Sequence, residues 1–418
     1  MHALIAMALA LGLLVVLLHR RVRVGRAMLC SAITLAVLLR VGPRAMLAAL
    51  VLEFRDPSVG LTQTTPYLFV SLTALLLGVN VLGAIMQSTG ISQRLIVAMY
   101  GLFRSRRAAL AGLPLLMGML PTPGGIMLSA PMVRDLGDSI GLERSRLAAI
   151  NFYFRHQWEP VWPLFPAIPL VQGILGVSAF AIIRYNLIIA LVGIVAGIVF
   201  LLLRDMPARA ENALPVGRRI HHHVGDLLGA FWPIALTATI YALFDVPPAG
   251  GIAISIVVLL VLHRVPRQKW GTLFKAANEP EMVLLVFSAL FFKLNLQAAD
   301  AISEVVVFFQ EVNMPPPLII FLLPFIVGFL SGVTMPSVAM TFPFLAAFIG
   351  TGADAKMPLE TLAFSGLLFG LLLTPVHLCL PLSAGYFQIP LPRIISRLLA
   401  PSAFTVLIVA ISVYILLR

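Results

Sequence analysis

One unusual passage occurs twice in this chain, and each copy interrupts an apolar segment with proline and glycine. The first copy reads LPLLMGMLPTPGG and the second reads LPFIVGFLSGVTMPS. Pro114 and Pro324 are separated by 210 positions, and so are Gly118 and Gly328. Because the spacing is kept between copies, we interpret the chain as an internal duplication.

A second pair of matching passages follows the first. The segment EPVWPLFP begins at Glu159, and TPVHLCLP begins at Thr374, so that Pro160 and Pro375 are 215 positions apart. Duplicated halves with hydrophobic segments broken at equivalent places are the best sequence indication of a secondary transporter's binding site.

The composition predicts an all-α polytopic membrane protein. Of the 418 residues, 60% are hydrophobic and 11% are charged, whereas a soluble domain has about 25% charged residues. The unit of organisation in lipid is a helix of about 20 apolar residues. The two cysteines, Cys30 and Cys379, both lie in apolar segments, which argues against a disulfide framework and favours a packing role.

The charge distribution predicts the orientation of the helices. Arg and Lys gather in short loops, while other loops carry acids, so the net charge of +12 reflects a positive-inside pattern and requires no nucleic acid. The first apolar run has no basic residue before it, which favours a membrane helix over a cleaved signal peptide. We expect both termini outside the cell inner (plasma) membrane. The acids of the outer loops are Asp56, Asp245, Asp300, Glu304, Glu311, Asp354 and Glu360.

These anchors predict two inverted repeats, because the first interrupted passage begins and ends on the basic side and the second on the opposite side. Each repeat is expected to contain a re-entrant hairpin and a broken transmembrane helix, and segments 92–103 and 301–313 to lie at the interfaces. The segment 27–50 is either one tilted helix or two shorter pieces. The predicted parts are an N-terminal helix (1–26), repeat 1 (27–203, hairpin 108–133, broken helix 148–175), a loop and linking helix (204–248), and repeat 2 (249–418, hairpin 316–350, broken helix 359–390).

The hairpin tips should present helix N-termini to the interior. The two prolines and two glycines of Pro121–Gly125 force the first chain to turn, and a new helix should start near Ile126. The second tip is expected to do the same, with Thr334 or Ser337 as a cap. Because exposed amide groups and the helix dipole favour negative charge, the tips predict an anion site. Alternatively, these residues only kink ordinary membrane helices.

Glu159 is the main candidate for ion coupling. It lies about 12 residues after Leu147, which places it about 18 Å deep, near the middle of a core about 30 Å thick. A carboxylate at that depth usually marks an ion or proton pathway. It would ligate a cation such as Na⁺, carry a proton, or form an ion pair with Arg155 on the same helix face. In the second half Thr374 occupies the matching position.

Other polar residues allow more than one interpretation. Arg155 suits a carboxylate or phosphate, or it snorkels to the interface. His377 is a packed histidine or a proton relay. The run His221–His223 has no Cys or carboxylate partners at metal-site spacing and favours a basic patch over a metal site. No phosphate-binding loop is present, so ATP-driven transport has no support.

With the paired hairpins and broken helices, the chain resembles the ion transporter superfamily, which includes divalent anion:sodium symporters, gluconate and citrate permeases and TRAP transporter large subunits. The resemblance covers about residues 27–417. Divalent anion symporters carry Ser-Asn-Thr at both tips, whereas this chain has Pro121–Gly125 and Thr334–Ser337 there. The resemblance implies a homodimer with elevator-type movement. It also implies one site at Thr122, Gly124 and Gly125 with the Glu159–Val161 break, and another at Thr334, Pro336 and Ser337 with Thr374–Val376. Together with the residues considered above, the expected substrate contacts are Thr122, Pro123, Gly124, Gly125, Ser129, Arg155, Thr334, Pro336, Ser337 and His377, and the expected ion contacts are Glu159, Pro160, Val161, Thr374, Pro375 and Val376.

These observations favour a secondary active transporter of a small organic anion, expected to be a carboxylate, coupled to Na⁺ or H⁺ and without another cofactor. A second hypothesis is an intramembrane enzyme that uses Glu159, His156 and His377 on a buried lipid-linked substrate. A third is a passive channel. Duplication argues against the enzyme, because catalysis does not need inverted halves.

Overall fold

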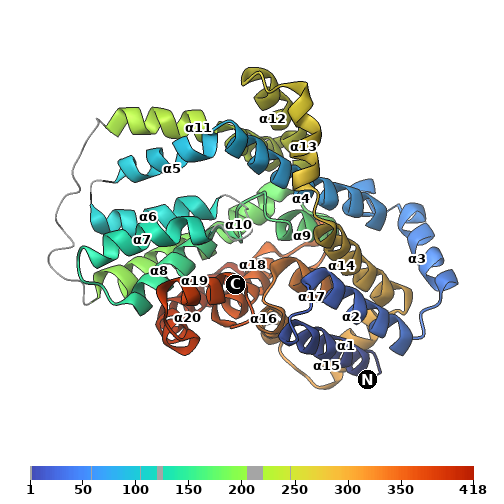
Figure 1. The fold of residues 1–418 in the computed structure, drawn as a ribbon. Coiled ribbons are helices and arrows are strands. Elements are labelled where there is room, and N and C mark those ends of the chain that lie inside the picture. The colour runs from blue at the N-terminus through green and yellow to red at the C-terminus, as the bar shows by residue number, and fades with distance from the viewer. Residues whose placement is uncertain (1, 58, 104, 120–125, 205–219, 245) are drawn as a thin grey trace.

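The protein is an all-α membrane protein. The computed structural model describes residues 2–418 except 58, 104, 120–125, 205–219 and 245, and within them all regular elements are helices (Figure 1). Six helical segments of the described chain are long and apolar enough to cross a membrane: α1 (His2–His19), α4 (Thr65–Ser88), Ala179–Leu203, which contains α10 (Ala179–Gly197), His222–Phe244 within α11 (Ile220–Phe244), α14 (Pro280–Ala298) and α20 (Leu391–Leu416).

The segment predicted as one tilted helix or two pieces is two helices. α2 (Val24–Leu38) and α3 (Pro43–Arg55) meet at an angle of 104°. Arg40 adopts a positive φ of 55°, and Pro43 occupies the first position of α3. Proline has no N–H to continue the helix before it but suits the start of the next one, which explains the bend.

Pairs of helices and interrupted helices lie near the positions predicted for the hairpins and the broken helices. Each half contains a short helix, two consecutive helices that pack against each other, a helix with a break in it, and then a long helix. These elements are α5 (Ile91–Leu102), α6 (Arg106–Gly118), α7 (Ile126–Asp138), α8 (Arg144–Arg155) and α9 (Ala167–Leu175) before α10, and α15 (Ala301–Glu311), α16 (Pro316–Ser331), α17 (Thr334–Ile349), α18 (Met357–Leu373) and α19 (Cys379–Phe387) before α20.

The packing of these helices is reciprocal between the halves. α2 packs against α14 and α12 (Pro248–Leu262) against α4, while α9 packs against α17 and α19 against α7. α8 contacts α20 as α18 contacts α10. Exchanged pairs of this kind indicate a pseudo-twofold relation. The correspondence extends to α1 and α11, each of which packs on the helix that follows it, so it includes elements that the sequence analysis placed outside the repeats. The exact repeat boundaries and the inversion across the membrane stay predictions.

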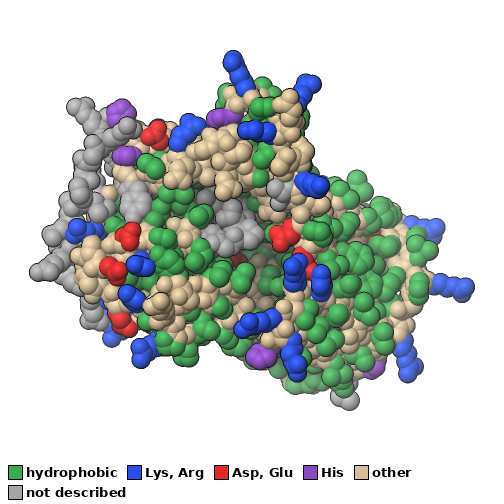
Figure 2. Space-filling view, in the orientation of Figure 1, with side chains coloured by type: hydrophobic (Ala, Val, Ile, Leu, Met, Phe, Trp, Pro, Cys, Tyr) green, Lys and Arg blue, Asp and Glu red, His purple; other side chains and the backbone are tan. Residues whose placement is uncertain are grey.

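The outer surface suits lipid. On the span Ala179–Leu203, Leu187, Leu191, Val195 and Val199 are 41%, 54%, 54% and 44% exposed and lie one turn apart, while Asn186 on the opposite face is buried. Figure 2 shows hydrophobic side chains over much of the visible surface. Apolar side chains outside with polar ones inside are expected when the solvent is hydrocarbon.

One expectation from the charge pattern is wrong. Glu360, assigned to an outer loop, is fully buried in the first turn of α18, where Asn186 donates a hydrogen bond of 3.1 Å to its carboxylate. Between α12 and α14 lies a further helix, α13 (Arg267–Ala277), which carries three basic residues. Cys30 and Cys379 are free, as expected, but Cys30 is exposed and does not pack inside.

Glycine allows α16 and α18 to pack backbone to backbone. A Cβ at Gly370 would clash with the carbonyl oxygen of Phe325 and lie 2.7 Å from the Phe329 nitrogen. We expect Gly370→Ala to lower the free energy of unfolding by about 1–3 kcal/mol, as overpacking does, measured by thermal unfolding in detergent. Gly385→Ala in α19 is the matched control, because a Cβ there meets nothing within 4 Å. Equal midpoints for the two variants would contradict this close packing.

Candidate functional site

The first helix break brings Glu159 against the second hairpin. α8 ends at Arg155, a short 3-10 turn covers His156–Trp158, and prolines at 160, 163 and 166 prevent a regular helix until α9 begins. Glu159 is 5% exposed. Its carboxylate lies close enough to Thr334, the first residue of α17, for the hydroxyl to act on it electrostatically. Residues about 175 positions apart in the chain are therefore in contact at the centre of the protein.

The second break contacts the same hairpin. The Nδ1 atom of His377 lies 2.7 Å from the carbonyl oxygen of Gly332 and donates to it. Gly332 has a φ of 66° and ends α16, a conformation that glycine adopts without steric cost. The backbone N–H of Val376 donates to the hydroxyl of Thr374 at 3.2 Å. Thr374, predicted to occupy the position matching Glu159, therefore pairs with a backbone N–H of the break in which it lies.

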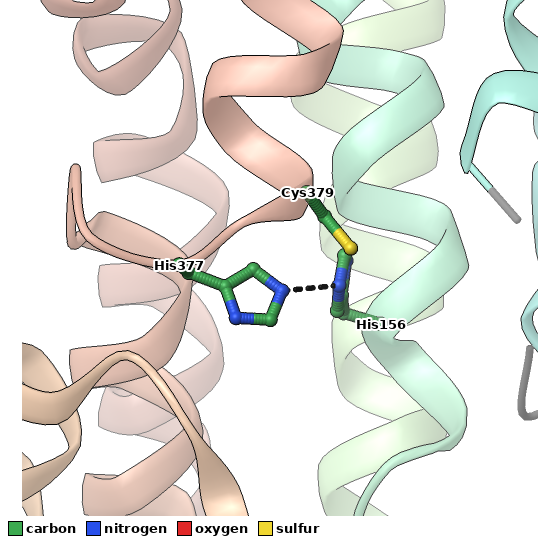
Figure 3. Close-up of side chains that lie close together, drawn as sticks. All are labelled: His156, His377 and Cys379. Carbon is green, nitrogen blue, oxygen red and sulfur yellow. Dashed lines mark hydrogen bonds between the residues drawn. The ribbon is translucent and has the colours of Figure 1, made fainter. Parts of the chain in front are cut away.

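His156 and His377 join the two breaks directly. Their Nε2 atoms are 2.9 Å apart, and Figure 3 shows the two rings edge to edge with the Cys379 side chain pointing toward His156. The Nε2 atom of His156 also lies 3.9 Å from a carboxylate oxygen of Glu159. Within the described residues, His156, His377 and Cys379 are the one group of three potential metal donors, with donor atoms no more than 4.8 Å apart.

Side chains of the first break also cover the end of the first hairpin helix. The guanidinium of Arg155 donates to the carbonyl oxygen of Met117 at 2.8 Å, and the Trp158 indole donates to that of Leu115, also at 2.8 Å. The last carbonyls of a helix have no partner within the helix, and a cation at that end is favourable. Arg155 is buried, so the alternative in which it snorkels to the interface is wrong.

The remaining predicted contacts are divided. Ser129 is buried and donates to Asn151 at 2.6 Å, which ties α7 to α8. Ser337 donates to the carbonyl oxygen of Val333 at 2.7 Å. The expectation that Thr334 or Ser337 caps α17 is wrong, because Val333 occupies the N-cap position and offers no side-chain acceptor. Whether these residues contact a substrate stays a prediction.

The two breaks differ in exposure. Pro160 and Val161 are buried, whereas Pro375 is exposed and Val376 is 37% exposed. Pro336 in the first turn of α17 is buried as well. Thr122, Pro123, Gly124 and Gly125 lie outside the described residues, as does the side chain of His221, so the predictions made for them are not tested.

Sequence reasoning missed one buried ion pair. The Lys293 ammonium of α14 lies 3.0 Å from the Glu53 carboxylate of α3, and both side chains are buried. The hydroxyl of Thr65 donates to the same carboxylate at 2.8 Å. Glu53 and Lys293 line a cavity of about 170 Å³. A charged residue within an apolar segment was the available signal, since such residues are rare in membrane helices and are usually paired.

Comparison with known proteins identifies a family but no activity. The family model described as "Protein of unknown function (DUF401)" matches residues 3–416. A search of the curated proteins finds no match for this chain.

The contact of Gly332 with the second break is testable. A Cβ at this position would lie 2.7 Å from the backbone nitrogen of His377 and 2.9 Å from the carbonyl carbon of Val376. We expect Gly332→Ala to lower the thermal unfolding midpoint more than Gly352→Ala does, by the equivalent of about 1–2 kcal/mol. Gly352 also has a positive φ, of 58°, but a Cβ there meets nothing within 4 Å, so it controls for backbone strain alone. If Gly332→Ala lowered the unfolding midpoint less than Gly352→Ala does, the turn at Gly332 would not be in close contact with the break.

Proposed function

The chain belongs to the DUF401 family, and we propose that it is a secondary active transporter of a small organic anion, coupled to Na⁺ or H⁺. The observation that carries this proposal is the meeting of the breaks and the second hairpin. Glu159 contacts Thr334, and His377 contacts both Gly332 and His156. Transporters with inverted repeats bind substrate and coupling ion at such a junction and move one bundle against the other around it.

The polar groups at this junction fit an anion together with a cation. The Glu159 carboxylate has one buried oxygen, Oε2, without a hydrogen-bond partner among the described residues, which is available to a cation or a proton. α17 begins beside it without a side-chain cap, and a helix N-terminus favours an anionic group. The guanidinium of Arg155, which acts electrostatically on Glu159, adds positive charge. We propose a carboxylate as the anion, because its planar oxygens match these donors.

The resemblance to the ion transporter superfamily supports the rest of the proposal. We propose a homodimer in the cell inner (plasma) membrane, with both termini outside and with elevator-type movement of the hairpins and broken helices. We also propose that Thr122 to Gly125, the predicted substrate residues of the first tip, contact the anion.

An intramembrane enzyme is a second candidate, because one specific observation favours it. His156, His377, Cys379 and Glu159 gather at one buried point, and acid–base catalysis needs groups of these types within hydrogen-bond reach. Turnover of a lipid-linked substrate without flux across the membrane would support the enzyme, and conductance without concentrative uptake would support a channel.

A ligand screen tests the substrate class. We expect one or more small carboxylates or sugar acids to raise the thermal unfolding midpoint of the purified protein, because a ligand that binds only the native state stabilises it by about 2.7 kcal/mol at 100 times its Kd. The screen is run with and without Na⁺ at two pH values. Stabilisation by cationic or neutral compounds alone would contradict an anion transporter.

Glu159→Gln tests the coupling role. Glutamine keeps a polar side chain near Thr334 but removes the charge, so we expect a folded protein whose coupled uptake into proteoliposomes falls at least about tenfold, the usual size of one lost functional interaction of about 1.4 kcal/mol. Glu311→Gln, at an exposed position in α15, is the matched control and should retain uptake. Unchanged coupling in Glu159→Gln would remove this carboxylate from the mechanism.

A further inference from the structure

Two backbone carbonyls determine the protonation of the histidine pair. The Nδ1 atom of His156 lies 2.6 Å from the carbonyl oxygen of Phe152, and that of His377 lies 2.7 Å from the carbonyl oxygen of Gly332. A carbonyl oxygen only accepts hydrogen bonds, so both Nδ1 atoms must carry hydrogen. A neutral imidazole has a single N–H. Two neutral rings would therefore face each other with two bare Nε2 atoms.

The separation of 2.9 Å between those Nε2 atoms is the length of an N–H hydrogen bond, and two lone pairs at that distance repel. One additional proton on either nitrogen converts the repulsion into a hydrogen bond. We propose that His156 and His377 bind one proton between them, shared by their Nε2 atoms, so that the pair carries a single positive charge. Given the proposed transport function, this proton is the coupling ion.

Burial disfavours a charge on the histidine pair, but two features of its surroundings favour a positive one. His156 occupies the C-cap position of α8, and Gly332, which accepts from His377, occupies that of α16. The carboxyl ends of helices carry partial negative charge and stabilise a cation. The ring of Phe152 lies 4.4 Å from the His156 ring and 5.7 Å from the His377 ring, measured between centroids, within the range of a cation–π contact.

Three other titratable or charged groups face the pair within the described residues. Glu159, 3.9 Å from the Nε2 atom of His156, attracts the bound proton. Arg155 repels the bound proton. Cys379, at the start of α19, lies close to both histidines. The positive charge of the protonated pair is therefore balanced in part by the negative charge of Glu159. When the proton leaves, Arg155 is the remaining positive group near that carboxylate.

The distances fit a proton better than a metal ion. Two nitrogen ligands on a tetrahedral Zn²⁺ at 2.0–2.1 Å would be about 3.3 Å apart, which is longer than the 2.9 Å between the two Nε2 atoms. The third donor atom would have to move as well, because the spread of the three donors reaches 4.8 Å. A metal ion would therefore require the rings to separate and Cys379 to approach.

The shared proton would link proton binding to movement. The hydrogen bond between the Nε2 atoms joins the break after α8 to the break before α19. These two segments are far apart in the sequence, so the intervening chain does not hold them together. When the proton leaves, two bare nitrogens face each other, and the contact between the halves becomes repulsive at this point. This step rests on the proposed function, whereas the binding of the proton does not.

Nitrogen NMR tests the proton site without any transport assay. The full chain has eight histidines, and ¹⁵N-histidine labelling in lipid bilayers distinguishes protonated from bare ring nitrogens. We expect His156 and His377 to carry hydrogen on Nδ1 throughout and to gain one proton as a unit, so that their Nε2 signals move together with pH. In His377→Gln a neutral amide donor replaces the ring, and the joint titration should disappear. His19→Gln, which removes an exposed histidine, should leave it unchanged.

Two results would overturn the shared proton: independent titration of the two rings with one proton each, or displacement of both signals by equimolar Zn²⁺ at neutral pH. Uptake into proteoliposomes tests the coupling role separately. We expect a proton gradient without Na⁺ to drive uptake in the wild type and at least a tenfold loss in His377→Gln. Uptake driven only by Na⁺ would end the coupling role and leave the proton site intact. Absence of transport for every carboxylate would end the proposed function instead.

Discussion

The structure depends on how the broken helices donate hydrogen bonds to the backbone carbonyls left unpaired at the ends of the hairpin helices. In lipid an unpaired backbone group costs several kcal/mol, so irregular chain at that depth needs partners from the protein. Arg155 and Trp158 donate to the last carbonyls of α6, and His377 donates to the end of α16. Each break therefore covers the hairpin of its own half, and the histidine pair connects the two halves.

This arrangement explains why polar chemistry concentrates at one point and why the halves are not equivalent there. The first break contributes an acid, Glu159, and the second contributes Thr374, whose hydroxyl accepts a hydrogen bond from the backbone N–H of Val376. His156 lies three residues before Glu159, whereas His377 lies three residues after Thr374, the counterpart of Glu159, so the two histidines are not equivalent positions of the duplication. A pseudo-symmetric scaffold thus holds an asymmetric set of groups.

Much of the fold was predictable because the bilayer imposes strict lengths and proline and glycine mark the ends of helices. The hairpin predicted at 316–350 corresponds to α16 and α17, Pro316–Ile349. The helix break at Glu159 lies directly before Pro160, which disfavours helical geometry at the preceding residue. Glu360 was misplaced because acids were assigned to loops. In the structure its carboxylate is buried and accepts a hydrogen bond from Asn186, 174 positions away in the chain. The partner of a buried acid is not encoded near it in the chain.

The sequence alone determined that this protein is a duplicated bundle of membrane helices, interrupted twice in equivalent places, because periodicity, charge and helix breakers act over short stretches of chain. Only the tertiary structure decided which groups meet. The contact of Glu159 with Thr334 and that of His156 with His377 join residues about 175 and 221 positions apart. Such contacts follow from how the two halves pack, a property of the folded chain that no local pattern contains.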